Sequence, residues 1–285
     1  MRFFKPYTLL IAAISISWAM VSCQKNVDFI VPDENGLNGP DTTWYTSVTS
    51  SMPVTHLKNE LAYPFQTDSF NLQSGVLNNF TTSTGLRISI PGGALYDQNG
   101  LAYSGPVIIN SLLITTKGDM LRMGISSITD DHQLVSEGSF YLDIRGNNNQ
   151  ELSPAFDHPI TVRFESQSPF SGNWGVYRGI QNNSNEFEWV PTDNYNSVNY
   201  SNDFFNVSCN GLHWIGVGSV HNVQPSEQTK ISVTLPSNYT NSNTMAFVSF
   251  DNMQSVLPMY GNRNSRRFES VALPKNRSEE HTSEL

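Results

Sequence analysis

The chain has 285 residues, of which 38% are hydrophobic and only 14% are charged. Its 16 Lys and Arg residues against 25 Asp and Glu residues give a formal net charge of -9 at pH 7. A negative field repels phosphate backbones, so this balance argues against a nucleic-acid partner. The sequence is also rich in Asn, Ser, Thr and Gly, a composition typical of β-sheets joined by many polar turns.

The first 22 residues have the pattern of an export signal. Arg2 and Lys5 give a positive start, and the uncharged run over residues 7–21 is short for a membrane span. The run ends at Ser22-Cys23, which resembles the lipobox of bacterial lipoproteins. We expect residues 1–22 to be a lipoprotein signal peptide and lipidated Cys23 to anchor the chain in the outer membrane, on the periplasmic or the exposed side. The alternative is a plain signal peptide followed by an incidental cysteine.

The cysteine count agrees with this interpretation. The chain has two cysteines, and lipidation of Cys23 leaves Cys209 with no intramolecular partner. A disulfide framework or a cysteine-based metal site is then impossible. We expect Cys209 to be a small core residue on a strand.

Residues 23–64 are predicted to be the lipidated cysteine and a flexible tether. The stretch over residues 31–44 is rich in Pro, Gly, Asn and Asp and lacks periodicity, which is typical of a linker. Within it, Asp41-Thr42-Thr43 fits the short pattern used for O-glycosylation in Bacteroidetes, so Thr42 is a candidate glycosylation site.

The last nine residues, 277–285, resemble the in-frame translation of a sequencing adapter. We expect the biological sequence to stop near Asn276, and we leave His281 out of functional arguments. The alternative is a natural polar tail.

From about Phe65 onward the sequence predicts an all-β fold of the sandwich type. Leu86 to Ile90 alternates apolar and polar residues, which is the period of a strand with one buried face. Residues 65–222 should form this sandwich and residues 223–276 a partial second β domain. Further strands are predicted between clusters of turn residues, at 107–114, 140–144, 160–164, 174–177, 187–190, 204–209, 214–217, 230–235, 245–250, 255–259 and 268–273.

The stretch from Gly85 to Leu95, GLRISIPGGAL, resembles the opening signature of ZU5-like β-sandwich domains. Six later features continue the resemblance over about residues 65–220: Asn99-Gly100, 105–109, 117–120, 134–140, Asn173-Trp174 and 213–215. The resemblance implies a surface lipoprotein of the Bacteroidetes type whose sandwich serves protein interaction without a catalytic centre. It supplies no site residue. On physical grounds we also expect Ile88 and Ile90 to face the core and Asp119 to cap a short turn.

The sequence contains no group of residues whose pattern indicates an enzyme, a metal or a cofactor. The sequence has no Gly-x-Ser-x-Gly elbow and no His-Glu-x-x-His motif. Cys209 and His213 flank a predicted turn, and Asp130-Asp131-His132 reads as a solvated turn between two strands. Asp143 and Glu151 could be paired acids, but carboxylates are too numerous for that pairing to be informative.

The aromatic residues offer one candidate binding site. Trp174, Tyr177 and Trp189, with Tyr195, lie close in sequence and could form a stacking platform for sugars. The alternative is that these side chains pack in the core of the sandwich. The leading hypothesis is a non-catalytic, lipid-anchored envelope protein for protein interaction or assembly. A carbohydrate-binding lipoprotein of a glycan-uptake system is the second hypothesis, and an enzyme whose catalytic part follows the present sequence is the third.

Overall fold

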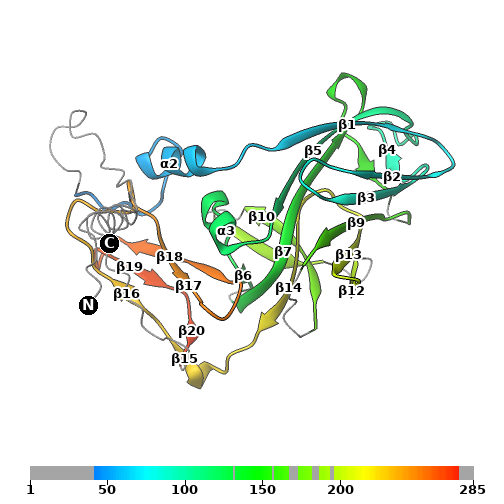
Figure 1. The fold of residues 1–285 in the computed structure, drawn as a ribbon. Helices are drawn as coiled ribbons and strands as arrows, with labels where there is room; N and C mark the ends of the chain where they lie inside the picture. Colours follow the sequence, from blue (N-terminus) through cyan, green and yellow to red (C-terminus); the bar gives the residue numbers. More distant parts are fainter. Residues whose placement is uncertain are drawn as a thin grey trace, which may run out of the picture. The chain divides into compact units, whose positions relative to one another are not determined.

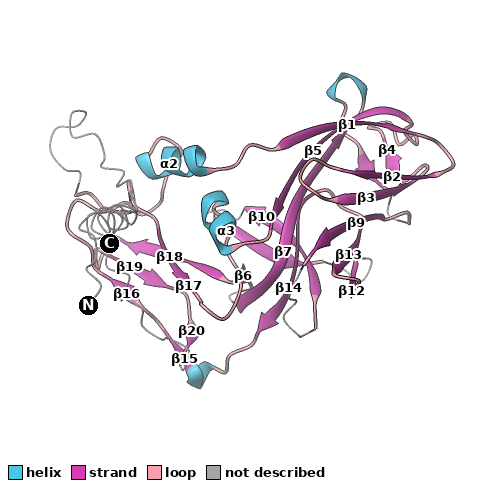
Figure 2. Cartoon of the chain, viewed as in Figure 1, coloured by secondary structure: helices cyan, strands magenta, loops and turns pink. Residues whose placement is uncertain are grey.

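The computed structural model describes residues 42–275 except 131, 156, 167–172, 182–185 and 193–195. Strands dominate this part of the chain, and every strand pairing is antiparallel, which confirms the predicted all-β class (Figure 2). Cys23, Tyr195 and the C-terminal segment 277–285 lie outside the described residues.

The larger sheet, here called sheet A, has the strand order β1-β5-β7-β14-β10-β11, and β6 pairs with one end of β7. Figure 1 labels all of these strands except β11. Strand β7 is the longest strand and pairs with β5 on one side and β14 on the other. The strands are β1 Gln66–Leu72, β5 Gly105–Ile114, β6 Ile128–Thr129, β7 His132–Arg145, β10 Gly175–Gln181, β11 Phe187–Pro191 and β14 His213–His221.

The second sheet, here called sheet B, has the order β12-β13-β9-β3-β2. Its strands are β2 Leu77–Thr81, β3 Arg87–Pro91, β9 Ile160–Glu165, β12 Ser197–Ser201 and β13 Phe204–Cys209. A two-stranded sheet pairs β4 Leu95–Tyr96 with β8 Ser153–Pro154, and a 3₁₀ turn spans Asn147–Asn149.

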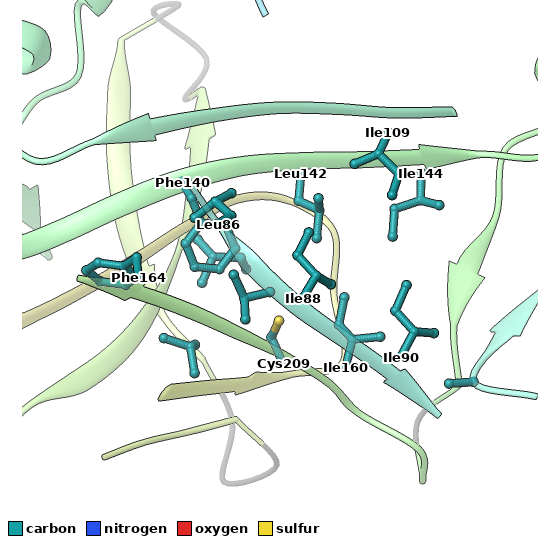
Figure 3. Close-up of a cluster of buried hydrophobic side chains, with 14 of the residues drawn as sticks. Leu86, Ile88, Ile90, Ile109, Phe140, Leu142, Ile144, Ile160, Phe164 and Cys209 are labelled. Atoms are coloured by element: carbon teal, nitrogen blue, oxygen red, sulfur yellow. The ribbon is translucent and has the colours of Figure 1, made fainter. Parts of the chain in front are cut away.

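The main hydrophobic core lies between the inward faces of sheets A and B (Figure 3). Burial alternates along β3, where Ile88 and Ile90 are 1% exposed, as the sequence predicts. Phe140 and Phe164 meet across the sheets with ring centroids 6.2 Å apart. Every second side chain along the strands of both sheets thus points inward, and the two sets interdigitate as in a β-sandwich.

Two short α-helices lie outside the sandwich core, α2 Pro53–Leu61 and α3 Lys117–Met123. Thr116 caps α3, because its hydroxyl accepts a hydrogen bond from the Asp119 backbone N–H at 3.1 Å and donates one to the Asp119 carboxylate at 2.7 Å. The prediction that Asp119 is the capping residue is therefore wrong. The N-cap is Thr116, and Asp119 is the residue to which its side chain is hydrogen-bonded. Met120 of α3 is buried against sheet A.

The C-terminal part forms a four-stranded sheet with the order β16-β19-β18-β17, which packs against the sandwich. Val256 joins the cluster that covers the outer face of sheet A, and Leu257 packs with Ile128. The strands are β16 Ser232–Val233, β17 Ala246–Ser249, β18 Val256–Asn262 and β19 Arg267–Ser270, with β15 Gln228–Thr229 pairing β20 Leu273–Pro274 and a 3₁₀ turn at Pro225–Glu227.

The predicted tether is wrong for residues 42–64. Trp44 is 8% exposed and packs on Phe268 of β19, with ring centroids 5.2 Å apart. The side chain of Asn241 holds the neighbouring Tyr45 backbone at both its N–H and its carbonyl. Indole burial outweighs the local linker composition, so the residues around Trp44 pack against the C-terminal sheet.

We expect Trp44→Ala to lower the free energy of unfolding by about 3 kcal/mol, because it removes a buried indole from the C-terminal sheet. Urea denaturation followed by circular dichroism measures the change. Val48→Ala is the control, since Val48 is 38% exposed in the same segment and should change stability by less than about 0.5 kcal/mol. Equal effects of the two substitutions would contradict the packing of Trp44.

Candidate functional site

The face of sheet A that points away from sheet B, here called its outer face, is divided into two parts. Helix α3 and β18 cover one part, where Leu112, Ile114, Tyr177 and Trp189 are buried with Val256. On the other part the aromatic side chains of Phe65, Tyr141, His213 and Trp214 reach the surface, and this group is here called the aromatic patch. Phe65 is 44% exposed, so the patch is open to solvent.

Strand register places the patch. Phe140 and Leu142 point into the core, so Tyr141 between them must point outward. Tyr141 is the cross-strand partner of Trp214, and their ring centroids are 5.3 Å apart in an edge arrangement. Phe65, next to the start of β1, lies 4.4 Å from the Tyr141 ring. Aromatic contacts of this geometry add roughly 0.5–1.5 kcal/mol each beyond burial, so the rings hold one another in place.

Two glycines make room for the indoles on this face. A Cβ on Gly216 would lie 2.9 Å from the Trp189 ring, and a Cβ on Gly179 would lie 2.4 Å from the Phe187 ring and 2.8 Å from the Trp214 Cβ. Phe187 contacts both Trp214 and Trp189 edge-on, with centroids 6.0 and 5.0 Å apart. Ring contacts therefore connect exposed Phe65 with buried Trp189. The absence of a side chain at Gly179 and Gly216 leaves the space that these rings occupy.

A row of polar side chains, here called the polar strip, crosses β1, β5 and β7 beside the patch. The Thr67 hydroxyl donates to the Asn110 Oδ1 at 2.9 Å, and the Asn110 amide donates to Asp143 at 3.4 Å. Asp143 also accepts from Arg145 Nε at 2.7 Å. Its other oxygen, Oδ1, is buried and has no hydrogen-bond partner in the described part of the chain. The strip thus combines an amide, a carboxylate and a guanidinium at the rim of an aromatic surface.

The charges of the strip affect the neighbouring groups. Burial raises the pKa of Tyr141, and the nearby Asp143 carboxylate raises it further, so this phenol remains neutral at physiological pH. The hydrogen bond and the charge of Asp143 raise the pKa of Arg145, which keeps the guanidinium charged. The patch therefore offers a neutral phenol next to a fixed ion pair.

The predicted sugar platform of Trp174, Tyr177 and Trp189 is not formed. Tyr177 and Trp189 are 6% and 2% exposed, under α3 and the C-terminal sheet. Trp174 packs on the other side of sheet A against Phe205, with its indole N–H bonded to Glu137 Oε1 at 3.1 Å. Trp174 therefore lies on the opposite side of sheet A from Tyr177 and Trp189, and burial removes the latter two from any ligand.

Cys209 and His213 are not a catalytic pair, because Cys209 is a fully buried core residue on β13, as predicted. His213 stacks on Tyr141 with ring centroids 5.7 Å apart. Asp130 and His132 lie at the turn between β6 and β7, where the ring Nδ1 is 2.7 Å from the Asp130 carbonyl oxygen.

Two further candidate residues from the sequence are Asp143, which lies in the polar strip, and Thr42, which lies on the surface. Asp143 pairs with Arg145 rather than with Glu151, which lies on an isolated bridge opposite Arg145. Thr42 is exposed, as a glycosylated residue must be. Across the described ranges, no three His, Cys, Asp or Glu side chains converge as metal ligands.

A shallow open hollow of about 660 Å³ lies beside β18 and β19. Tyr45, Lys230, Arg263 and Glu269 are among its lining residues. Hydrogen bonds from Asn262 and Ser265 lower the pKa of Glu269, so its carboxylate is ionised and already bonded within the chain.

Sequence reasoning missed the aromatic patch. Tyr141 and Trp214 were part of predicted strands, but no ligand role was assigned to them. The signal that identifies them is the alternation of side chains along a strand. Both residues are next to core residues, Phe140, Leu142 and Ile215, and must therefore point to the outer face. Phe65 could not be found in this way, because it precedes β1 and reaches the sheet only through the path of the chain.

Burial raises the pKa of the Cys209 thiol to about 12 from an ordinary 9.0. In a Cys23→Ala chain, where Cys209 is the one remaining cysteine, we expect the native protein to resist iodoacetamide at pH 8 and the urea-unfolded protein to react. Between about pH 9 and pH 12 the unfolded thiol ionises while the folded thiol does not, so stability falls as pH rises. Native alkylation at the unfolded rate, measured by mass spectrometry, would contradict this burial.

Neither the known protein-family models nor the curated protein sequences give a match to this chain. In the described part of the chain, no helix has the length and apolar character that crossing a bilayer requires.

Proposed function

We propose that this protein is a non-catalytic, lipid-anchored envelope protein whose β-sandwich binds another envelope protein through the aromatic patch. The observation that carries the proposal is the aromatic surface on sheet A, where Phe65 is exposed and contacts the half-buried rings of Tyr141 and Trp214. Aromatic residues are enriched in the centres of protein interfaces, where they supply much of the binding energy.

The arrangement of the patch supports binding rather than catalysis. The Asp143 carboxylate is held by Arg145 and Asn110, and Cys209 is sealed in the core with a raised pKa, so neither group is poised for reaction. The patch itself offers ring faces, one neutral phenol and an ion pair at its rim. These are features of a recognition surface with an apolar centre and a polar border.

The position of the module at the envelope rests on the N-terminal sequence. Ser22-Cys23 after an uncharged run resembles a lipobox, and acyl chains on Cys23 would contribute roughly 0.8 kcal/mol per buried methylene to membrane anchoring. The resemblance of residues 65–220 to ZU5-like domains of surface lipoproteins agrees with an interaction role. The β-sandwich architecture is the part of this resemblance that the fold supports.

A glycan is the second candidate ligand, and one observation favours it. Tyr141 and Trp214 present rings next to the amide of Asn110 and the Asp143–Arg145 pair, and sugars combine an apolar ring face with hydroxyl groups. This candidate replaces the buried Trp189 platform with a different surface. Loss of glycan-array binding on Trp214→Ala, without a protein partner at the patch, would favour it over the first candidate.

Lipidation is tested with the full-length precursor expressed in a bacterial host. We expect Cys23→Ala to remove labelled palmitate from the protein and to leave the precursor uncleaved, because the acylated thiol is the substrate of the processing enzymes. Cys209→Ala is the matched control and should keep the label. Equal labelling of the Cys23→Ala chain and its parent would exclude the anchor.

The binding surface is tested by placing a photo-crosslinking amino acid at Phe65 in cells of the native host. We expect a discrete crosslinked partner protein, at a yield reduced about tenfold or more by Trp214→Ala, since removal of an interface Trp costs 2 kcal/mol or more. Leu101, which is 66% exposed, is the control position and should give no such species. A crosslink that is indifferent to Trp214→Ala would show that the patch is not the interface.

A further inference from the structure

The outer face of sheet B, which points away from sheet A, carries two arginines in direct opposition. Arg87 of β3 and Arg163 of β9 are cross-strand partners in the register of the sheet. Directly opposed side chains on one face lie about 5 Å apart at their Cβ atoms, and like charges at that distance destabilise the pairing. Two adjacent guanidinium groups on an open sheet face therefore call for a compensating interaction.

Phe204 supplies part of that compensation. It lies on β13, the strand beside β9, and both guanidinium groups lie over its ring, with Cζ atoms 4.4 Å (Arg87) and 4.9 Å (Arg163) from the centroid. The ring quadrupole attracts both cations and fixes their positions. The Nε of Arg163 is buried and has no hydrogen-bond partner in the described part of the chain. The two cations are thus held next to each other over one aromatic ring.

Among the residues that the structure describes, no carboxylate forms a salt bridge with either arginine. The salt bridges found among the described residues involve Arg145 and His158 and neither of these arginines. Glu165, two residues along β9 from Arg163, faces the same side without forming an ion pair with it. Two adjacent arginines that lack an acidic partner within the described ranges can accept an anion from outside the chain.

The surroundings of the pair are hydroxyl and amide groups. The side chains of this face lie in cross-strand rows defined by the register, and the row of Arg87 and Arg163 continues into Asn206 and Asn199. Asn206 Nδ2 donates to Asn199 Oδ1 at 3.1 Å, and Ser89 donates to Asn79 at 2.6 Å. The neighbouring row consists of Asn79, Ser89, Thr161, Ser208 and Ser197.

We propose that the outer face of sheet B binds an acidic polysaccharide, with Arg87 and Arg163 as ligands for its carboxylate groups. The face spans five strands, which gives room for an extended polymer, and its Ser, Thr and Asn side chains can exchange hydrogen bonds with sugar hydroxyls. Phe204 is a positioning residue that orders the two guanidinium groups. The net charge of -9 disfavours densely charged polyanions, so a polymer with one carboxylate per sugar fits better.

This site is independent of the aromatic patch, because the patch lies on the outer face of sheet A and the arginine pair on the outer face of sheet B. Failure of one proposal leaves the other standing. A Trp214→Ala chain should therefore bind the polysaccharide as the parent does.

The experiment measures binding of polygalacturonate oligomers to the full-length chain in detergent by calorimetry. Fully methyl-esterified oligomers share the backbone and lack the charge, and poly-glutamate carries the charge on a peptide. We expect binding of polygalacturonate alone, weakening with added salt. Arg87→Gln or Arg163→Gln should each weaken it about tenfold or more, since hydrogen bonds to charged groups are worth about 1.5–3 kcal/mol. Phe204→Leu should weaken it severalfold and leave the salt dependence unchanged.

Arg178→Gln is the matched control, because Arg178 is an exposed arginine of β10 in sheet A and its loss changes the net charge equally. It should leave the affinity within twofold of the parent. Thermal unfolding verifies that the variants are folded, and neutralising one of two opposed like charges should not lower the midpoint. Equal binding of the methyl ester, equal or tighter binding of poly-glutamate, no binding of any of the three polymers, or affinity unaffected by the two arginine substitutions would each overturn the proposal.

Discussion

The structure depends on the packing of inward side chains from sheets A and B against one another. Because side chains alternate along a strand, the burial of Phe140, Leu142 and Ile144 in this core obliges Tyr141, Asp143 and Arg145 to point outward. A slip of one residue would expose the whole apolar set. The core therefore fixes the two outer faces of the sandwich as firmly as it fixes its interior, and both proposed binding surfaces lie on those faces.

Additional layers then decide which parts of the outer faces remain available. Helix α3 and the C-terminal sheet cover one part of sheet A, and Trp189 donates its indole N–H to the Ser126 carbonyl at 2.8 Å beneath them. Trp214, two strands away from Trp189, keeps part of its ring at the surface. Two indoles on one face of one sheet thus differ in role because one is covered and the other is not. The outer face of sheet B keeps its arginine pair in solvent-accessible positions.

Strands with apolar periodicity could be predicted from the sequence, and the prediction placed β3, β5, β9, β13 and β14 close to their observed positions. Strands β1, β2 and β12 could not be predicted in this way, because they are edge strands with largely polar residues. They are held by backbone hydrogen bonds to the neighbouring strand and have no continuous buried face that would give an apolar period. Trp44 was missed for a related reason. Its local composition is that of a linker, and the side chain that buries it, Phe268, is more than two hundred residues away in sequence.

Local periodicity and composition are sufficient to predict the all-β class, the inward residues of the main strands and the burial of Cys209, because these properties arise within one strand or segment. The N-terminal lipid anchor stays a prediction from the sequence. Which outward side chains come together, as Phe65 does with Tyr141 and Arg87 with Arg163, depends on the tertiary structure. Such contacts between side chains depend on the strand order and on which elements cover each sheet. Both are set by contacts between residues far apart in the chain.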